Sequence, residues 1–220
     1  MLRDVQRPDG TRVGRLRVAT PKRTMGIEAP YRKADTSRQH PAHRIYPYLL
    51  RGFNIDRPSQ GRVMDITCLP MQRGFANLVG LLDWATRRIL AWRRSDSLTA
   101  DFCAEALEEA IIRFGAPGIM NTVQVSQFAG SEFIASLTGR DIRISTGGKD
   151  CWRDIVFVER LWSTLKDEDV YPHAYYTVSA ASVSLTRYVS FHNIRRPHSA
   201  LARQAPDATY FDRLPLAATA

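Results

Sequence analysis

The chain has 220 residues, 44% of them hydrophobic, which suits one sizeable core with an appended segment rather than two complete domains. Its net charge of +9 lies entirely in residues 1–62, with 14 Lys and Arg against 5 Asp and Glu, whereas residues 63–220 hold 17 of each. No apolar run approaches the roughly 18 residues that span a bilayer, and the start lacks a signal-peptide core. The three cysteines show no zinc or disulfide spacing, so we expect a cytoplasmic protein without a membrane partner.

The basic N-terminal arm is typical of a protein that binds a polyanion. Each phosphate that Lys or Arg neutralises releases condensed counterions, which favours binding. Aromatic residues lie among the basic ones of this arm: Tyr31, Tyr46, Tyr48 and Phe53. Nucleic acid is therefore the favoured partner, although a solvated tail that keeps the chain dissolved explains the charge alone about as well.

The first 60 residues show no sustained hydrophobic period. Residues 1–24 resemble a fragment, with weak helical character over 13–20 that Pro21 interrupts. Residues 29–60 are basic and contain several prolines. We interpret them as a mostly extended linker with one short ordered piece at 45–53.

From residue 62 the pattern changes to short strands and a helix. Three strand-like runs with short connections predict an antiparallel meander. They cover residues 62–70, 75–84 and 87–94. An apolar residue then recurs every four positions from Phe102 to Phe114, which predicts an amphipathic helix over 99–114.

The second half alternates between strands and helices. Short strands are predicted at 118–123 and 141–145, on either side of a helix over 126–138, and this order implies parallel pairing. Two further helices precede a basic tail; they cover residues 153–166 and 178–192. Three antiparallel strands followed by alternating helices and strands is the order of the ribonuclease H-like fold. We therefore predict an α/β class with a mixed sheet, flanking helices and a basic extended N-terminal arm.

Two carboxylates are candidates for a metal centre: Asp65 on the first predicted strand and Glu159 on a late helix. Cleavage of a phosphodiester requires stabilised charge on the entering and leaving oxygens, which two Mg²⁺ ions about 3.5–4 Å apart supply. Mg²⁺ prefers hard oxygen ligands, so carboxylates from separate elements must converge. Taken singly, Glu159 is more often a solvated helix residue and Asp65 a turn former, so only their combination supports the prediction.

Several stretches carry a specific resemblance to a known family. They are residues 44–51, 64–67, 100–103, 152–154, 157–162 and 195–199. They resemble the integrase core of bacterial insertion-sequence transposases of the retroviral-integrase superfamily, and above all the family numbered three among insertion sequences. The site of that class is an Asp, Asp, Glu triad, and the similarity covers roughly residues 12–214.

The resemblance implies a Mg²⁺-dependent nuclease and strand transferase that acts in DNA transposition and integration. Asp65 and Glu159 would be its catalytic carboxylates and its metal ligands. The residues that would bind DNA are Lys166, Arg160, Arg195 and Arg196. Besides DNA, the implied partners are a second copy of the chain or other transposase subunits.

The resemblance also divides the chain into three parts. Residues 1–28 would be the remnant of an N-terminal helix-turn-helix-like DNA-binding region. Residues 29–60 would be the basic linker, and residues 61–214 the integrase-type catalytic core.

One departure from the family bears directly on catalysis. The family writes its middle segment Asn-Thr-Asp-Gln-Gly-Ser-Gln-Phe, whereas residues 121–128 read Asn-Thr-Val-Gln-Val-Ser-Gln-Phe. Between Val123 and Glu159 lie 35 residues, the separation that the family shows between its second Asp and its Glu. Val123 therefore stands at the second Asp and offers no side-chain oxygen to a metal. We expect catalysis to be abolished or nearly so.

Other departures and other interpretations remain open. Val125 replaces a glycine, Ile155 an asparagine, and Arg62 stands where the family has a tryptophan or a neighbouring apolar residue. The chain is either a transposase-derived enzyme inactive in this copy, a non-catalytic module that binds DNA or transposase subunits, or a decayed gene product. His192 is interpreted as a surface histidine near a helix end, and Trp162 as a packing residue.

Overall fold

The structure is a computed structural model that describes residues 5–6, 12–13, 46–123, 126–147 and 152–213. The chain forms two compact units, residues 1–41 and 42–220. In the first unit, β1 (Val5–Gln6) and β2 (Arg12–Val13) pair antiparallel. The rest of the helix-turn-helix-like region predicted over residues 1–28 lies outside the described residues, as does the weakly helical stretch after Val13.

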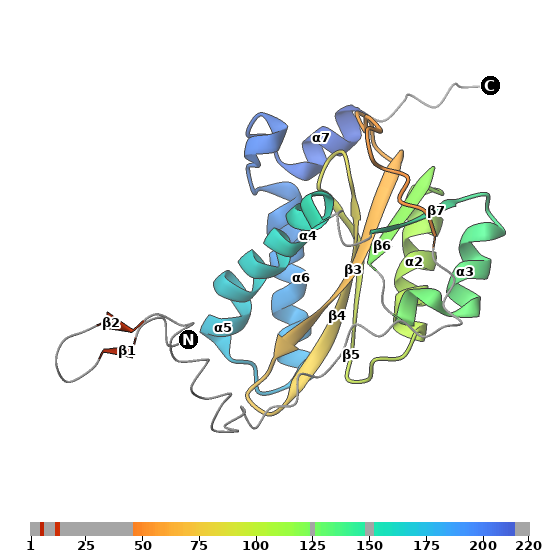
Figure 1. Cartoon of the computed structure of the whole chain (residues 1–220). Coiled ribbons are helices and arrows are strands. Elements are labelled where there is room, and N and C mark those ends of the chain that lie inside the picture. Colours follow the sequence, from red (N-terminus) through yellow and green to blue (C-terminus); the bar gives the residue numbers. More distant parts are fainter. Residues whose placement is uncertain (1–4, 7–11, 14–45, 124–125, 148–151, 214–220) are drawn as a thin grey trace. The chain divides into compact units, whose positions relative to one another are not determined.

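Five strands form the sheet of the second unit (Figure 1). They are β3 (Gly61–Pro70), β4 (Phe75–Asp83), β5 (Ile89–Ser95), β6 (Ile119–Val123) and β7 (Arg143–Gly147). Their order across the sheet is β5-β4-β3-β6-β7. The pairs β3/β4 and β4/β5 are antiparallel, and β3/β6 and β6/β7 are parallel. The mixed sheet predicted from the element order is confirmed.

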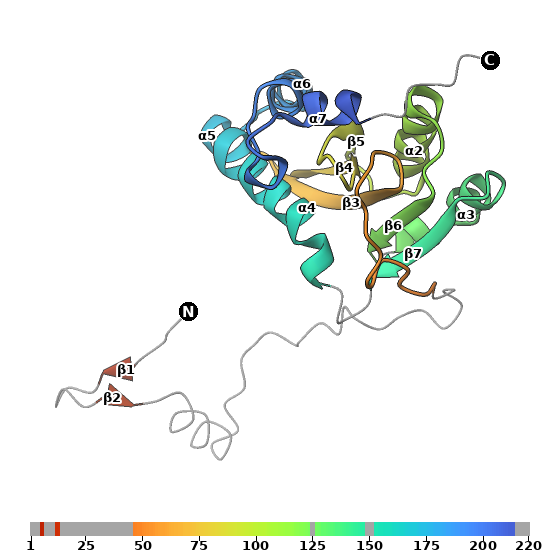
Figure 2. The ribbon, with the colours of Figure 1, turned by 90° about the horizontal axis from the view of Figure 1, so that it is seen from above.

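Helices cover both faces of this sheet (Figure 2). The longer ones are α2 (Asp101–Phe114), α3 (Ser131–Thr138), α4 (Trp152–Leu165) and α6 (Val178–Ile194). The shorter ones are η1 (Ser126–Ala129), the π-helical turn η2 (Lys166–Val170), α5 (Tyr171–His173), η3 (Ser199–Leu201) and α7 (Pro206–Asp212). None of the helices in the described part of the chain is long and apolar enough to cross a bilayer.

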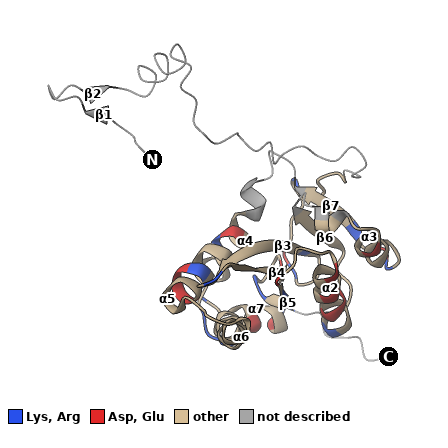
Figure 3. Cartoon of the chain, turned by 90° about the horizontal axis from the view of Figure 1, so that it is seen from below, with Lys and Arg blue, Asp and Glu red and all other residues tan. Residues whose placement is uncertain are grey.

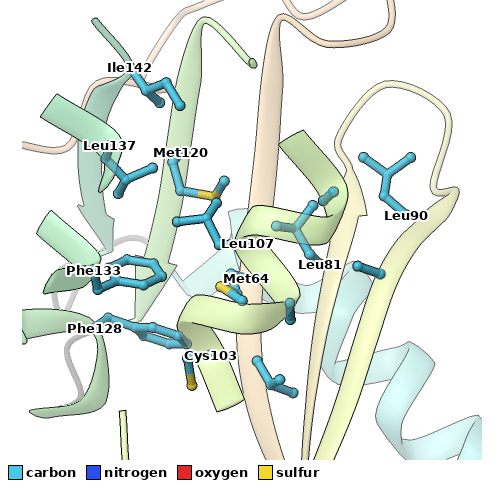
Figure 4. Packing of buried hydrophobic residues seen from close by; sticks show 14 of the residues in the cluster. Met64, Leu81, Leu90, Cys103, Leu107, Met120, Phe128, Phe133, Leu137 and Ile142 are labelled. Atoms are coloured by element: carbon cyan, nitrogen blue, oxygen red, sulfur yellow. The ribbon is translucent and has the colours of Figure 1, made fainter. Parts of the chain in front are cut away.

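Two hydrophobic cores lie on opposite faces of the sheet. The first packs α2 and α3 against it, and Figure 4 shows Phe128, Phe133 and Leu107 around Met64. The second packs α4 and α6 against the other face. Side chains alternate along a strand, so Met64 enters the first core while Val63 enters the second. The same alternation brings Asp65 to the face that α4 covers.

The structure differs from the prediction at two places. The helix expected over 126–138 is divided, because Gly130 has an extended backbone (φ −61°, ψ 140°) between η1 and α3. Helix α7 was not predicted, since it has only seven residues and its tie to the body is tertiary: Tyr210 is buried in the first core. A short helix of this kind owes its stability to packing rather than to a local pattern.

Part of the predicted linker lies within the second unit, which begins at residue 42. Leu50 is buried, and the backbone N–H of Leu49 donates to Oγ of Ser145 on β7 at 3.1 Å. This part of the predicted linker therefore contacts the core at Leu49 and Leu50.

Candidate active site

Asp65 lies in the middle of β3, where a side chain of α4 binds its carboxylate. Its partner across the antiparallel ladder is Gly80 on β4. The indole Nε1–H of Trp162, on α4, donates to Oδ2 of Asp65 at 2.9 Å. The carboxylate is therefore fixed between the sheet and α4 rather than pointing freely into solvent.

The environment of Asp65 raises its pKa above the ordinary value. Burial is the main cause, because it disfavours the charged form, and the charge of Glu159 acts in the same direction. Hydrogen bonds from Trp162 and from the backbone N–H of Ile66, together with the charge of Lys166, lower the pKa in opposition. The two family-like residues of α4 and η2 are thus close enough to Asp65 to affect its charge.

Glu159 lies on the solvent side of α4. Val158 and Trp162, its neighbours on the helix, are buried, whereas Glu159 itself is exposed, as its helical spacing indicates. Lys166 lies two turns further on, at the start of η2, and is partly buried. The structure therefore brings three predicted site residues, Asp65, Glu159 and Lys166, to one side of the sheet.

Val123 ends β6, the strand parallel to β3. The strand register pairs Met64 on β3 with Thr122 and, on the other side of β6, Val123 with Gly147 on β7. Asp65 follows Met64 on β3, and Val123 follows Thr122 on β6. The backbone of Val123 is therefore on the strand next to Asp65, one residue after the Met64–Thr122 pair. Gln124 and Val125 lie outside the described residues.

Among the described residues, Asp65 and Glu159 are the candidates to hold a divalent ion. Mg²⁺ is commonly held by one or two carboxylates together with waters and substrate phosphates, so two carboxylates of this kind would fit a single ion. Among the residues with described positions, no group of three or more His, Cys, Asp or Glu is arranged to hold a metal. A pair of ions would require a further oxygen ligand beside Asp65.

The predicted DNA-binding residues fall into two groups. Arg160 is exposed on α4 and Arg195 is exposed at the end of α6. Arg196 instead donates through both terminal nitrogens to the carboxylate of Glu168, at 2.5 and 2.7 Å, and this pair raises its pKa. The ribbon in Figure 3, coloured by residue type, has both basic and acidic residues between α4 and α5, so this part of the chain is not uniformly basic.

Sequence reasoning missed the hydrogen bond of Trp162 and the role of Gly80. Trp162 packs in the second core, as predicted. Its position three residues after Glu159 also makes the two residues neighbours on the helix, and this spacing could have indicated that Trp162 lies near the site. Gly80 gave no such signal, because its place opposite Asp65 depends on the strand register. The interpretation of His192 as a surface residue was wrong: it is only 3% exposed.

Models of a known protein family match this sequence. One model of the integrase core domain matches residues 56–150, and a second model of the same description matches residues 144–206. The matched region contains the whole sheet and both carboxylates. Fold and matches together define the class: the chain belongs to the integrase core family.

Its curated relatives are proteins of insertion sequences. Transposase InsF for insertion sequence IS3A of Escherichia coli K12 is 25% identical over 196 residues, which cover 86% of this chain and 68% of that protein. The insertion element IS600 uncharacterized 31 kDa protein of Shigella sonnei is 24% identical over 206 residues, 91% of this chain and 76% of that protein. Within the integrase core family, the chain is a relative of the insertion sequence three transposases.

Solved structures share the fold. The HTLV-2 integrase catalytic core domain in complex with magnesium has a TM-score of 0.58 at 17% identity, over 70% of this chain and 97% of that one. A chain of the simian T-cell lymphotropic virus intasome in complex with the PP2A regulatory subunit B56 gamma has a TM-score of 0.62 at 20% identity. That match covers 82% of this chain and 64% of the longer viral chain. The ribonuclease H-like arrangement predicted from the sequence is confirmed.

Proposed function

We propose that this chain is a transposase integrase core that binds DNA but has lost most or all phosphodiester cleavage. The observation that carries the proposal is the neighbourhood of Asp65. The charges of Glu159 and Lys166 act on the pKa of its carboxylate, while the next position on the parallel strand, Val123, is a residue whose side chain contains no oxygen. These observations support a site that keeps two of the three carboxylates of the resembled family.

Asp65 and Glu159 are the residues that would hold Mg²⁺. When bound, the ion supplies positive charge to the phosphate oxygens and orients them. Lys166 would add a contact to a DNA phosphate on the same side of the sheet. With only two carboxylates, a second ion would lack protein ligands. The site would then not stabilise the entering and the leaving oxygen at the same time, as a two-ion site does.

A non-catalytic DNA-binding or subunit-binding role is the alternative that the charge distribution favours. The excess of nine positive charges lies in residues 1–62, separate from the balanced remainder of the chain. Exposed Arg160 and Arg195 add basic groups to the body itself. Other proteins of this fold occur in assemblies: the HTLV-2 catalytic core in a dimeric form, and the simian T-cell lymphotropic virus protein in an intasome. A protein of this kind would occupy DNA ends or join active subunits without cutting.

A nicking assay tests the proposal. Purified chain, Glu159→Gln and Val123→Asp are each incubated with supercoiled plasmid and with duplex DNA in Mg²⁺ or Mn²⁺. We expect no nicking by the unmodified chain and a gain in Val123→Asp that disappears in the double variant Val123→Asp/Glu159→Gln. Val123→Asn is the matched control, because it has the size of Asp without its charge. Metal-dependent nicking by the unmodified chain that is lost in Glu159→Gln would refute the proposal.

A further inference from the structure

The contact between Trp162 and Asp65 joins the hydrophobic core to the candidate metal site. Trp162 is 7% exposed, and its ring packs in the second core among Leu78, Leu165 and Leu185. The polar edge of the ring reaches Oδ2 of Asp65, where the donor and acceptor atoms are 2.9 Å apart. Since the ring is confined by its packing, the N–H is held in a fixed direction.

Gly80 makes room for this ring. A Cβ atom built on Gly80 would stand 2.4 Å from Cη2 and 3.0 Å from Cζ2 of Trp162, closer than real Cβ atoms approach another carbon. Gly80 is also the cross-strand partner of Asp65. The absence of a side chain at this one position of β4 lets the indole cross the strand and reach the carboxylate opposite.

We propose that Trp162 and Gly80 form a positioning unit that fixes the carboxylate of Asp65 for metal binding. The indole N–H donates to Oδ2 and so fixes the orientation in which the carboxylate would meet a divalent ion. This inference rests on the proposed function, in which Asp65 is a metal ligand. Trp162 acts through Asp65 and is a positioning residue, not a catalytic one.

Partners that orient a metal-binding side chain affect affinity strongly, and their removal typically costs about 10- to 100-fold in metal binding. Trp162→Phe retains an aromatic ring and removes the N–H donor. Gly80→Ala retains the indole and displaces it. Both variants should weaken Mn²⁺ binding about tenfold, because each removes the hydrogen bond to Oδ2 of Asp65: Trp162→Phe lacks the donor, and Gly80→Ala displaces it.

Two controls separate this effect from general damage to the fold. Trp84→Phe changes another tryptophan that packs against the second core, where its ring lies edge-on to Phe157. Gly130→Ala adds a Cβ that meets only ordinary contacts, the nearest atom being Cβ of Ala100 at 3.5 Å. Both controls should bind Mn²⁺ as the unmodified chain does.

The test has two measurements on the full chain. The first, without metal, follows hydrogen exchange of the four tryptophan indole N–H signals by NMR, with Trp162→Phe assigning its signal. We expect exchange at Trp162 to accelerate at least several-fold in Asp65→Ala. The second measures Mn²⁺ affinity by calorimetry in the variants and controls above and in Asp65→Ala.

The outcomes separate the two proposals. Unchanged exchange at Trp162 in Asp65→Ala would overturn the positioning unit whatever the metal does. Mn²⁺ affinity that depends on Asp65 yet stays equal in Trp162→Phe and Gly80→Ala would overturn it as well, and leave the proposed function standing. Affinity that is indifferent to Asp65→Ala would overturn the metal role of Asp65, and with it the inference. Accelerated exchange together with a tenfold loss in both variants supports it.

Discussion

Arg62 donates from Nη1 to the carbonyl oxygen of Gly115 at 2.7 Å. Nη2 of the same guanidinium donates to the carbonyl of Phe114 at 2.8 Å, and the side chain is fully buried. The last carbonyls of a helix have no partner within it, and a cation near them also interacts favourably with the helix dipole. Arg62, which departs from the family pattern, thus closes the C-terminal end of α2.

Arg62→Met should lower the free energy of unfolding by about 2–4 kcal/mol, because it leaves buried carbonyl oxygens without donors. Urea unfolding followed by circular dichroism measures the change. Arg187→Met, at an exposed position of α6, is the matched control and should change stability by less than about 0.5 kcal/mol. Equal small effects at both positions would show that Arg62 does not support α2.

His192 makes stability depend on pH. Burial lowers its pKa to about 4, while Nε2 lies 3.1 Å from the carbonyl oxygen of Arg87. The unfolded chain binds the same proton with a pKa of about 6.5. Between these values the unfolded state holds more protons, so stability falls as the pH drops from about 6.5 to about 4. The loss amounts to about 3 kcal/mol and is absent above pH 7.

Free energies of unfolding at pH 7.5, 6, 5 and 4.5 test this dependence in the unmodified chain and in His192→Gln. In this range the free energy of unfolding of the variant should change less steeply with pH than that of the unmodified chain. The difference in slope should be about 1.4 kcal/mol per pH unit, which corresponds to one proton. His173→Gln, which changes an exposed histidine, should retain the dependence of the unmodified chain. Parallel curves for the unmodified chain and His192→Gln would contradict the burial account.

Restoring a carboxylate at position 123 should cost stability when no metal is bound. The new Asp would stand on the strand next to Asp65, whose pKa burial and Glu159 already raise. We expect Val123→Asp to lower the free energy of unfolding by about 1–2 kcal/mol in EDTA through repulsion of like charges. Mg²⁺ should return part of the loss, since an ion that binds only the folded state stabilises it.

Thermal unfolding with and without Mg²⁺ measures this recovery. Val123→Asn carries the same loss of an apolar residue without the charge, so its melting temperature should respond to Mg²⁺ as that of the unmodified chain does. A melting temperature of Val123→Asp that is indifferent to Mg²⁺ would argue against a metal site at this position.

The fold could be predicted further than the site. Strand alternation and the four-residue period over α2 depend on local patterns, and Gly115, with a φ of 72°, ends that helix where the sequence indicates. The pairing of Trp162 with Asp65 depends on two elements separated by 97 positions. No local pattern in the sequence determines the strand register that sets Gly80 opposite Asp65, or the chain path that brings Arg196 to Glu168. The residue types of the site could therefore be predicted from the sequence, whereas the contacts that support them could not.

Lys166 should contribute to DNA binding through a phosphate. Lys166→Gln is expected to reduce the steepness of the salt dependence, the slope of log K against log salt, by about 0.9. Fluorescence anisotropy with a labelled duplex at several KCl concentrations measures the slope. Arg113→Gln is the control, because Arg113 lies on α2 and pairs with Glu109 at 2.8 Å.

We expect a smaller change in slope for Arg196→Gln than for Lys166→Gln, because the guanidinium of Arg196 already donates to the carboxylate of Glu168. Equal slopes for Lys166→Gln and Arg113→Gln would remove Lys166 from the DNA contact.

The most direct measurement is anomalous diffraction from crystals of the unmodified chain soaked in Mn²⁺. We predict no more than one ion, held between the carboxylates of Asp65 and Glu159. Two fully occupied ions about 3.5–4 Å apart, the separation of a working two-metal site, would contradict the loss of function at Val123.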